Sequence, residues 1–393
     1  MKKTALLLKL AQDVRASYWF IPATMVIAAL ALAYVSEWAD RHVDLLPLQL
    51  PATFTDTQVE GARSTLSTIA TSVIGVTGVM FSMTIVAVSF AAGNYGPRLI
   101  GNFMRDRGNQ ISLGILIATF VYALSILRAV QDPSEAAGGE AFVPQYSMLL
   151  AMIGSIVAVF TMIYFVHHVP ETINVSNITS NLGQRLEREI ISLIDAEADL
   201  DALSEDTYPD RDPDAHITSE EAGYIQTLNY NRLEDLTKER AWVIRIEKLP
   251  GEFISTFTPV LSVWCDASLS DDERANLRDC YAVGASRTEH QNVLFLVDEL
   301  VEMLARALSP GVNDPFTAIN CLNWMHNALK VAQHHGDGLG KTGASRHRLE
   351  PKLTYDRLFE HSYLASEPYC RTDELVMKQY KDFVADLKAD LVA

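Results

Sequence analysis

The sequence has 393 residues, enough for two or three structural units, and its 49 Asp and Glu against 32 Lys and Arg leave a net charge of −17. Residues 1–169 contain ten basic and ten acidic residues, so the whole excess lies in residues 170–393. A neutral, apolar first part and an acidic second part are typical of a membrane domain with a water-soluble domain attached. The acidic balance argues against nucleic-acid binding, because phosphates bind basic surfaces.

Four nearly uncharged stretches predict a transmembrane domain over residues 1–169. Each is close to the roughly 20 residues needed to cross a hydrocarbon core of about 30 Å. The first opens with aromatic residues that suit the membrane interface, Tyr18, Trp19 and Phe20. The four predicted spans are residues 18–35, 64–92, 110–127 and 146–169.

The segments outside these spans alternate in net charge: +3 before the first span, then −3, +2 and −2 in the three connections. Positive segments stay in the cytoplasm, so we expect a bacterial inner-membrane protein with both termini cytoplasmic. Met1-Lys-Lys followed by leucines also resembles a signal peptide. Because Lys9, Asp13 and Arg15 interrupt that early apolar run, we favour an uncleaved membrane anchor.

The second span differs from the other three because small and hydroxylated residues form one stripe along it. Alternating steps of four and three residues, broken only by Ile85, place the stripe on one helix face: Ser64, Thr68, Thr71, Gly75, Gly78, Ser82 and Ser89. Such a face allows close helix packing in membranes. Small hydroxylated residues also line narrow aqueous pores. Both interpretations stay open, and several copies packed around one axis would combine them.

No Asp, Glu, Lys or Arg lies at the centre of a span, which argues against an ion-coupled transporter but not against a channel. His167 and His168 end the fourth span. Adjacent helical positions point about 100° apart, so the two imidazoles are not expected to share a metal ion. They are either polar interfacial residues or a pH-sensing pair, because histidine titrates near neutrality.

The rest of the chain is predicted to be a cytoplasmic α+β region. Residues 170–221 are expected to form an amphipathic connecting helix and then a linker rich in acids. Residues 222–265 contain three short β-branched or aromatic runs, which predict a small β-barrel or sandwich module. Residues 266–393 are predicted to be a helical domain, with helices over 271–307 (broken near Gly284), from Pro315 through Val331 and over 373–392.

Local signals place the starts of three helices in this domain. Ser270 is a predicted N-cap with Glu273 at capping-box spacing, and Arg287 is predicted to open the helix that follows the break. Pro310 and Gly311 end that helix, while Asp314 caps the next one with Pro315 at its first position.

The sequence predicts neither a metal site nor a cofactor site. The cysteines have no metal-ligand spacing, and we expect reduced, partly buried thiols, with a disulfide pair as the alternative: Cys265, Cys280, Cys321 and Cys370. Gly336–Arg348 is Gly-rich with Lys341, Arg346 and Arg348, but it lacks nucleotide-binding spacing, so we expect an exposed loop.

The run from Arg306 to Ile319, Arg-Ala-Leu-Ser-Pro-Gly-Val-Asn-Asp-Pro-Phe-Thr-Ala-Ile, resembles the signature of a widespread bacterial family of multi-pass membrane proteins, catalogued as a domain of unknown function. The resemblance extends over essentially the whole chain, including Phe165–His168, Gly223–Gln226 and Pro250–Phe253. It implies the architecture but no established activity. One departure is Asn292, where the family pattern leads us to expect an acidic residue.

This signature loop is a candidate site with three interpretations: a structural corner, a ligand or interface site, and a catalytic site. Its polar and turn-forming residues are Ser309, Pro310, Gly311, Asn313, Asp314 and Thr317. Asn and Asp side chains can bind a cation, and a helix N-terminus can bind an anion. Catalysis would also need a base, for which the candidates are His326, His334, His335 and His347. The same residue types are the ordinary chemistry of a turn with a helix cap, so we favour the corner.

Three functions therefore remain open. We favour a homo-oligomeric, cation-passing channel whose axis is lined by the second span, because that span is the most specific feature. The acidic tail, as a vestibule or regulatory domain, would enrich cations. The alternatives are a membrane-anchored sensor or scaffold that binds a ligand or protein, and a membrane enzyme, which we do not expect because no nucleophile–base pair is visible. The expected partners are the lipid bilayer, further copies of the chain, and ions or a small ligand.

Overall fold

The computed structural model describes residues 17–42, 57–96, 106–133, 141–198, 209, 211–265, 268–339, 348–349 and 353–392. They form two compact units, one within residues 13–93 and 97–174 and the other made mainly of residues 175–393. We call them the membrane unit and the C-terminal unit. The predicted features at Met1–Arg15, Lys341, Arg346 and His347 lie outside the described residues.

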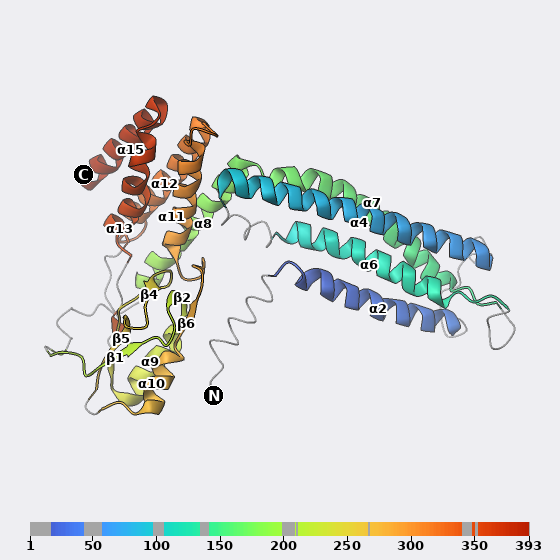
Figure 1. Ribbon diagram of the computed structural model, residues 1–393, viewed down its shortest axis with the longest axis horizontal. Coiled ribbons are helices and arrows are strands. Elements are labelled where there is room, and N and C mark those ends of the chain that lie inside the picture. The colour runs from blue at the N-terminus through green and yellow to red at the C-terminus, as the bar shows by residue number, and fades with distance from the viewer. Residues whose placement is uncertain are drawn as a thin grey trace. The chain divides into compact units, whose positions relative to one another are not determined.

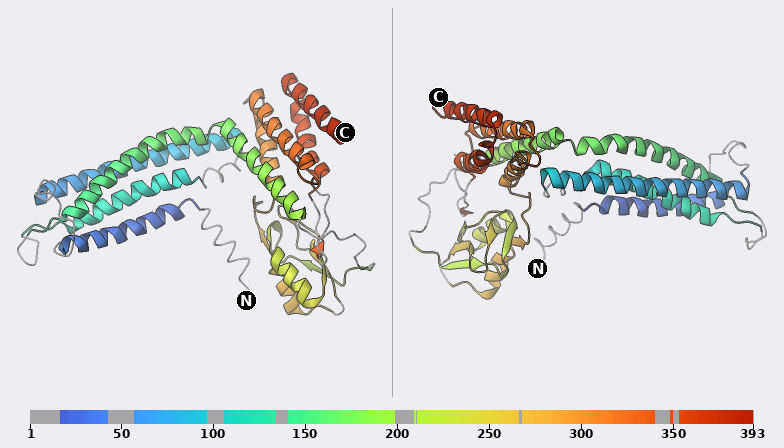
Figure 2. Two further views of the ribbon diagram at one scale, coloured as in Figure 1. Left: turned by 180° about the vertical axis from the view of Figure 1, so that it is seen from behind. Right: turned by 45° about the horizontal axis from the view of Figure 1, so that its top comes forward.

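The membrane unit consists of four long helices that lie side by side (Figures 1 and 2). All four are long and apolar enough to cross a membrane, which confirms the predicted spans. Each helix is longer than its apolar stretch because polar residues continue the helix past the hydrocarbon boundary. The helices are α2 (Phe20–Arg41), α4 (Val59–Tyr95), α6 (Arg107–Ala129) and α7 (Gln145–Thr172).

The end of α7 differs from the prediction that the span stops before Pro170. The helix continues through Pro170 to Thr172, and a second helix, α8 (Val175–Ala198), begins three residues later. A proline removes one backbone donor, and near a helix end that loss is small enough for the helix to continue for a few residues. The predicted connecting helix is therefore α8, and it begins five residues later than expected.

Glycines on α6 allow the neighbouring helices to approach it closely. A Cβ added at Gly114 would lie 2.4 Å from the Sδ of Met25 on α2. A Cβ added at Gly108 would lie 2.4 Å from the Nε2 of His168 on α7. Small residues at such crossings are the usual means of packing helices in a membrane. Because both α2 and α7 meet α6 in this way, α6 is the central helix of the unit.

A carboxylate on α2 caps the first turn of α7. The Oδ1 of Asp40 accepts from Tyr146 N at 2.8 Å, and its Oδ2 accepts from Ser147 N at 2.9 Å and from Ser147 Oγ at 2.5 Å. The Tyr122 hydroxyl donates to the Ser147 carbonyl at 3.1 Å. The first N–H groups of a helix have no partner within the helix, so Asp40 satisfies two of them from another element. In the sequence analysis Asp40 contributes only to the net charge of the connection after the first predicted span.

The C-terminal unit contains a group of helices and a small β module (Figure 2). In the helical group, α8 packs on α11 and α12, and α15 packs on α12. The helices that follow the β module are α11 (Val293–Ala307), α12 (Pro315–His334), α13 (Tyr355–Phe359), the π-helical turn η3 (Glu360–Leu364), α14 (Ala365–Cys370) and α15 (Glu374–Val392).

The β module consists of two small sheets that share one hydrophobic core. One sheet has the order β1-β5-β3-β7 and contains Ala215–Thr218, Pro259–Trp264, Val243–Ile246 and Arg348–Leu349. The other has the order β4-β2-β6 and contains Phe253–Ile254, Gly223–Leu228 and Tyr281–Gly284. Neighbouring strands are antiparallel except β3 and β7. The core includes residues of α9 (Tyr230–Arg240) and α10 (Asp271–Arg278). The predicted class, four membrane helices and an α+β region, is confirmed.

Two details of the predicted C-terminal organisation are wrong. Residues 281–284 form strand β6 instead of a helix, and the next helix starts at Val293 instead of near Arg287. Residues 215–218, expected within the acidic linker, form strand β1. In both cases the segment is too short for its own residues to indicate a strand. Pairing with a strand distant in the sequence decides its conformation: β6 pairs with β2, and β1 pairs with β5.

Candidate functional site

The stripe of small residues on α4 lies on the side of the helix that faces away from its own bundle. Its seven members are all exposed. The buried positions also follow steps of four and three residues: Ala62, Leu66, Ala70, Val73, Thr77, Met80, Thr84, Ala87 and Ala91. Since an α-helix turns by about 100° per residue, the centres of the two faces lie roughly 180° apart. Packing within one chain therefore does not explain the stripe.

Glycines on α4 and α6 show the difference directly. Apart from the adjoining residues and nearby backbone of α4 itself, no described atom lies within 4 Å of a Cβ added at Gly75, Gly78 or Gly93. On α6, by contrast, a Cβ at Gly108 or Gly114 would lie 2.4 Å from a neighbouring helix. The α6 glycines are used for packing inside the monomer. Those of α4 are not used in this way within the described residues.

Two hydroxyl groups of the stripe, those of Thr68 and Ser82, can lie in an apolar environment without an unsatisfied donor. Thr68 Oγ1 donates to the Ser64 carbonyl at 2.8 Å, and Ser82 Oγ donates to the Gly78 carbonyl at 2.9 Å. Such bonds to the preceding turn satisfy the O–H while leaving oxygen lone pairs directed outward. The stripe therefore offers hydrogen-bond acceptors without any fixed charge.

A carboxylate lies at the N-terminal end of this face. Glu60 is in the first turn of α4, is exposed, and precedes Ser64 by four residues, so it continues the stripe. The α4 sequence from Ser64 to Ala92 then carries no charged residue. Because the predicted span began at Ser64, sequence reasoning left Glu60 in a loop and missed its place on the stripe.

His167 and His168 point to different partners, as expected for adjacent helical positions. The His167 side chain is exposed, with its Nε2 3.3 Å from Glu171 Oε1. His168 Nε2 lies 2.8 Å from Asp106 Oδ1, and its ring stacks on Tyr164 with 4.9 Å between ring centroids. Asp106 also caps α6 by accepting from Asn109 N at 2.8 Å. His168 thus links α7 to the first turn of α6, whereas His167 does not take part in packing.

The signature loop has the backbone of a tight turn followed by a capped helix. Asn313 has a left-handed conformation with φ +49°, and its N–H donates to the Ser309 carbonyl at 3.0 Å. Asp314 Oδ1 accepts from Thr317 N at 3.1 Å, and Oδ2 accepts from the Thr317 hydroxyl at 2.6 Å. Pro315 occupies the first turn of α12. The capping role predicted for Asp314 and Pro315 is confirmed.

Other parts of the loop have no such structural role. Pro310 and Gly311 are exposed, and no described atom lies within 4 Å of a Cβ added at Gly311. The side chains of Val312 and Phe316 are also exposed, the latter at 73%. The three described histidines proposed as bases have partners elsewhere: His326, His334 and His335 pair with Asp386, Asp390 and Asp195. The geometry therefore favours the structural corner over a catalytic loop.

The segment between β6 and α11 joins the β module to the helical group. Gln291 has φ +56°, and its side-chain amide pairs with the backbone of Leu228, accepting from its N at 2.9 Å and donating to its O at 3.0 Å. Glu289 forms an ion pair with Arg185 of α8. Asn292, the position that departs from the family pattern, is buried against Gly251. These residues are structural. The sequence gives no indication that a side-chain amide will pair with the backbone of a distant strand, as Gln291 does with Leu228 of β2.

The cysteines are buried free thiols. Burial raises the pKa of Cys280, Cys321 and Cys370 to about 12, so each stays protonated at neutral pH. Protonated, buried thiols are poor nucleophiles and poor metal ligands. Within the described ranges no three His, Cys, Asp or Glu side chains are arranged to hold a metal ion.

The chain is similar to mycobacterial proteins over its greater part. It is 28% identical over 273 residues to uncharacterized protein Mb1321c of Mycobacterium bovis and to uncharacterized protein Rv1290c of Mycobacterium tuberculosis. Each match covers 67% of this chain and 50% of the relative, so the chain spans about half the length of these relatives. No solved structure matches the chain. The model of a family described as predicted membrane protein (DUF2254) matches residues 15–386, so the chain belongs to that family, as the signature loop indicated.

Proposed function

We propose that this protein is a homo-oligomeric channel of a bacterial inner membrane, in which one α4 from each copy surrounds the axis and the stripe lines the passage. The observation that carries the proposal is the outward direction of the stripe, where a Cβ added at Gly75 or Gly78 would meet no side chain of the described bundle within 4 Å. In this arrangement both termini and the C-terminal unit are cytoplasmic, and the C-terminal unit forms the vestibule.

The exposed faces of the other helices support an axial position for α4. Exposed positions of α7 carry large apolar side chains, including Ile156, Phe160 and Ile163, and α2 exposes Ile27 and Leu30. These are the residues expected to face lipid, because burying large apolar surface in hydrocarbon is favourable. A face of Gly, Ser and Thr gains much less from lipid. It gains more from another helix or from water.

Large apolar residues border the stripe on both sides. Val79 and Val86 lie along one edge and Ile74 and Phe81 along the other, all exposed in the monomer. Around an axis, these edges would contact the α4 helices of the neighbouring copies while the small residues between them face the passage. One helix face can in this way supply both the subunit contact and the lining.

Charge favours the passage of cations. Glu60 stands at the end of the stripe where the connections of the chain are acidic, so copies around an axis would place a ring of carboxylates at one mouth. Rings of acidic side chains are a common selectivity element of cation channels. The acidic C-terminal unit would raise the cation concentration at the other mouth. Because no residue from Ser64 to Ala92 is charged, the passage of a cation would not be coupled to the movement of a proton or a second ion.

The test is the conductance of the purified full-length protein in planar bilayers, compared with Gly78→Leu. A leucine at Gly78 would place four carbons in the passage, so we expect the single-channel conductance to fall at least tenfold. The matched control is Ala28→Leu, which adds similar bulk at an exposed position of α2 and is expected to conduct like the wild type.

Three results of the bilayer experiment would contradict the proposal. They are silent bilayers under varied pH, tension and voltage, equal conductance of wild type and Gly78→Leu, and equal loss in Gly78→Leu and Ala28→Leu. A monomeric state of the protein in lipid nanodiscs would also contradict it, because a single α4 cannot enclose an axis.

A further inference from the structure

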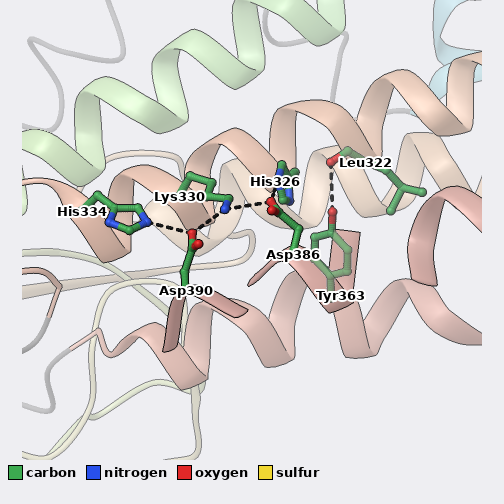
Figure 3. Close-up of polar contacts among 7 residues, drawn as sticks. All are labelled: Leu322, His326, Lys330, His334, Tyr363, Asp386 and Asp390. Atoms are coloured by element: carbon green, nitrogen blue, oxygen red, sulfur yellow. Dashed lines mark hydrogen bonds and ion pairs between the residues drawn. The ribbon is translucent and has the colours of Figure 1, made fainter. Parts of the chain in front are cut away.

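The last helix, α15, is attached to α12 by a ladder of ionisable side chains (Figure 3). α12 contributes His326, Lys330 and His334, spaced four residues apart and therefore on one face. α15 contributes Asp386 and Asp390, also four residues apart. We call these five residues the ladder. Its basic and acidic members alternate along the contact.

Every carboxylate of the ladder is shared between two basic groups. Asp386 Oδ2 lies 3.0 Å from His326 Nε2 and 2.7 Å from Lys330 Nζ. Asp390 Oδ2 lies 2.8 Å from His334 Nε2 and also contacts Lys330 Nζ. Lys330 therefore bridges the two aspartates, and the two histidines bind them from either side (Figure 3).

His326 is the enclosed member of the ladder. Its side chain is 16% exposed, against 58% for His334, and its ring stacks on Phe383 of α15 at 4.1 Å between centroids. Its Nδ1 is buried with no hydrogen-bond partner among the described residues. A neutral His326 can donate from Nε2 to Asp386 and leave Nδ1 without a proton. A second proton would have to sit on Nδ1, where no acceptor is present.

The charges acting on His326 are those of Asp386 and Asp390, which favour its protonation, and of Lys330, which opposes it. Burial outweighs them and lowers the pKa of His326 below its ordinary value. Hydrogen bonds from Lys330 lower the pKa of both aspartates, so they stay ionised while His326 titrates. From α13, Tyr355 faces Lys330 and Asp390, and from η3, Tyr363 lies near Asp386.

A second side of α12, about 100° around the helix from the ladder, is held by different residues. Asn327 donates to Glu187 of α8 at 2.9 Å, and His335 Nε2 lies 2.9 Å from Asp195 of α8. These contacts do not involve α15. A proton bound by the ladder therefore acts on the docking of α15 and not on the contact between α8 and α12.

We infer that the ladder is a pH-sensitive latch, which holds α15 on α12 at neutral pH and releases it when His326 takes up a second proton. A histidine whose pKa is lowered on folding contributes stability above its unfolded pKa of about 6.5, and this contribution is lost as the pH falls through the lower folded value. Release would uncover the buried Val376 and Leu387 of α15 and the ring of Tyr363, which packs on Tyr380.

The test is hydrogen–deuterium exchange of the full-length protein in lipid nanodiscs between pH 7.5 and 4.5, with rates corrected for intrinsic exchange. In the wild type we expect peptides of α15 to exchange at least tenfold faster at the acidic end, with a midpoint below 6.5 and above the titration of ordinary carboxylates at about 4. His326→Phe retains the stacking on Phe383 without a titrating group, so its α15 should exchange at one rate across this range.

Two further variants separate the latch from general loosening. His335→Phe removes the histidine that pairs with Asp195 of α8, outside the ladder, and should respond to pH like the wild type. His326→Gln retains a donor towards Asp386 and provides a second non-titrating variant. Unchanged protection of α15 in the wild type from pH 7.5 down to pH 4.5 would overturn the inference without any variant. Persistence of the response in both His326 variants would also overturn it.

Discussion

Replacing Gly183 by alanine should loosen the contact between α8 and α12. A Cβ at this position would lie 2.4 Å from two atoms of the Trp324 ring and 2.6 Å from a third. Overpacking of this kind costs about 1–3 kcal/mol, and a rigid indole puts the cost near the upper end. Alanine in place of glycine returns about 1 kcal/mol through helix propensity. The expected net loss is therefore about 2 kcal/mol, or about 4–8 °C in the melting temperature of a unit of this size.

The measurement is thermal unfolding of the C-terminal unit within the full chain in detergent micelles, followed by tryptophan fluorescence. The matched control is Gly311→Ala in the same unit, where no described atom lies within 4 Å of the added Cβ. We expect that control to change stability by less than about 0.5 kcal/mol. Equal melting temperatures for Gly183→Ala and Gly311→Ala would refute the reasoning, because the contact of the new methyl group with Trp324 would then cause no net loss of stability.

Two further predictions concern the membrane unit. Asp40→Ala removes the acceptor for two N–H groups of α7 and should lower the free energy of unfolding by about 1–3 kcal/mol, measured by thermal unfolding followed by circular dichroism. The control Glu37→Ala breaks an exposed ion pair with Arg41, which contributes at most about 1 kcal/mol. Equal losses would show that the Asp40 cap does not stabilise the unit. If copies meet along the stripe, Ser82→Cys should form dimers with a short thiol crosslinker and the buried Thr84→Cys should not. Dimers from both variants, or from neither, would count against that contact.

Features that depend on a few neighbouring residues could be predicted from the sequence. The capping box of Ser270 and Glu273 forms both of its hydrogen bonds, and Asp314 caps α12 as expected. The membrane helices follow from continuous apolar stretches, because each helix satisfies its own backbone within the bilayer. In all these cases the interacting groups lie within four residues of one another.

Features that depend on distant residues could not be predicted. Strand β6 has four residues and forms only because β2 lies beside it, and Gln291 pairs with a backbone 63 residues away. The ladder of α12 and α15 likewise joins positions 60 residues apart, so its histidines were assigned in the sequence to a different site as bases for the signature loop. Which acid faces which histidine depends on how the helices pack.

The second membrane helix separates the two kinds of information most clearly. By itself the sequence determines that one face of α4 is small and hydroxylated, since that depends only on residue type and helical spacing. It does not determine which face is buried, because the opposite face, with Ala62, Ala70, Ala87 and Ala91, is also rich in small residues. The tertiary structure decides this, since the side chains of α6 and α7 pack against the alanine-rich face and leave the stripe exposed.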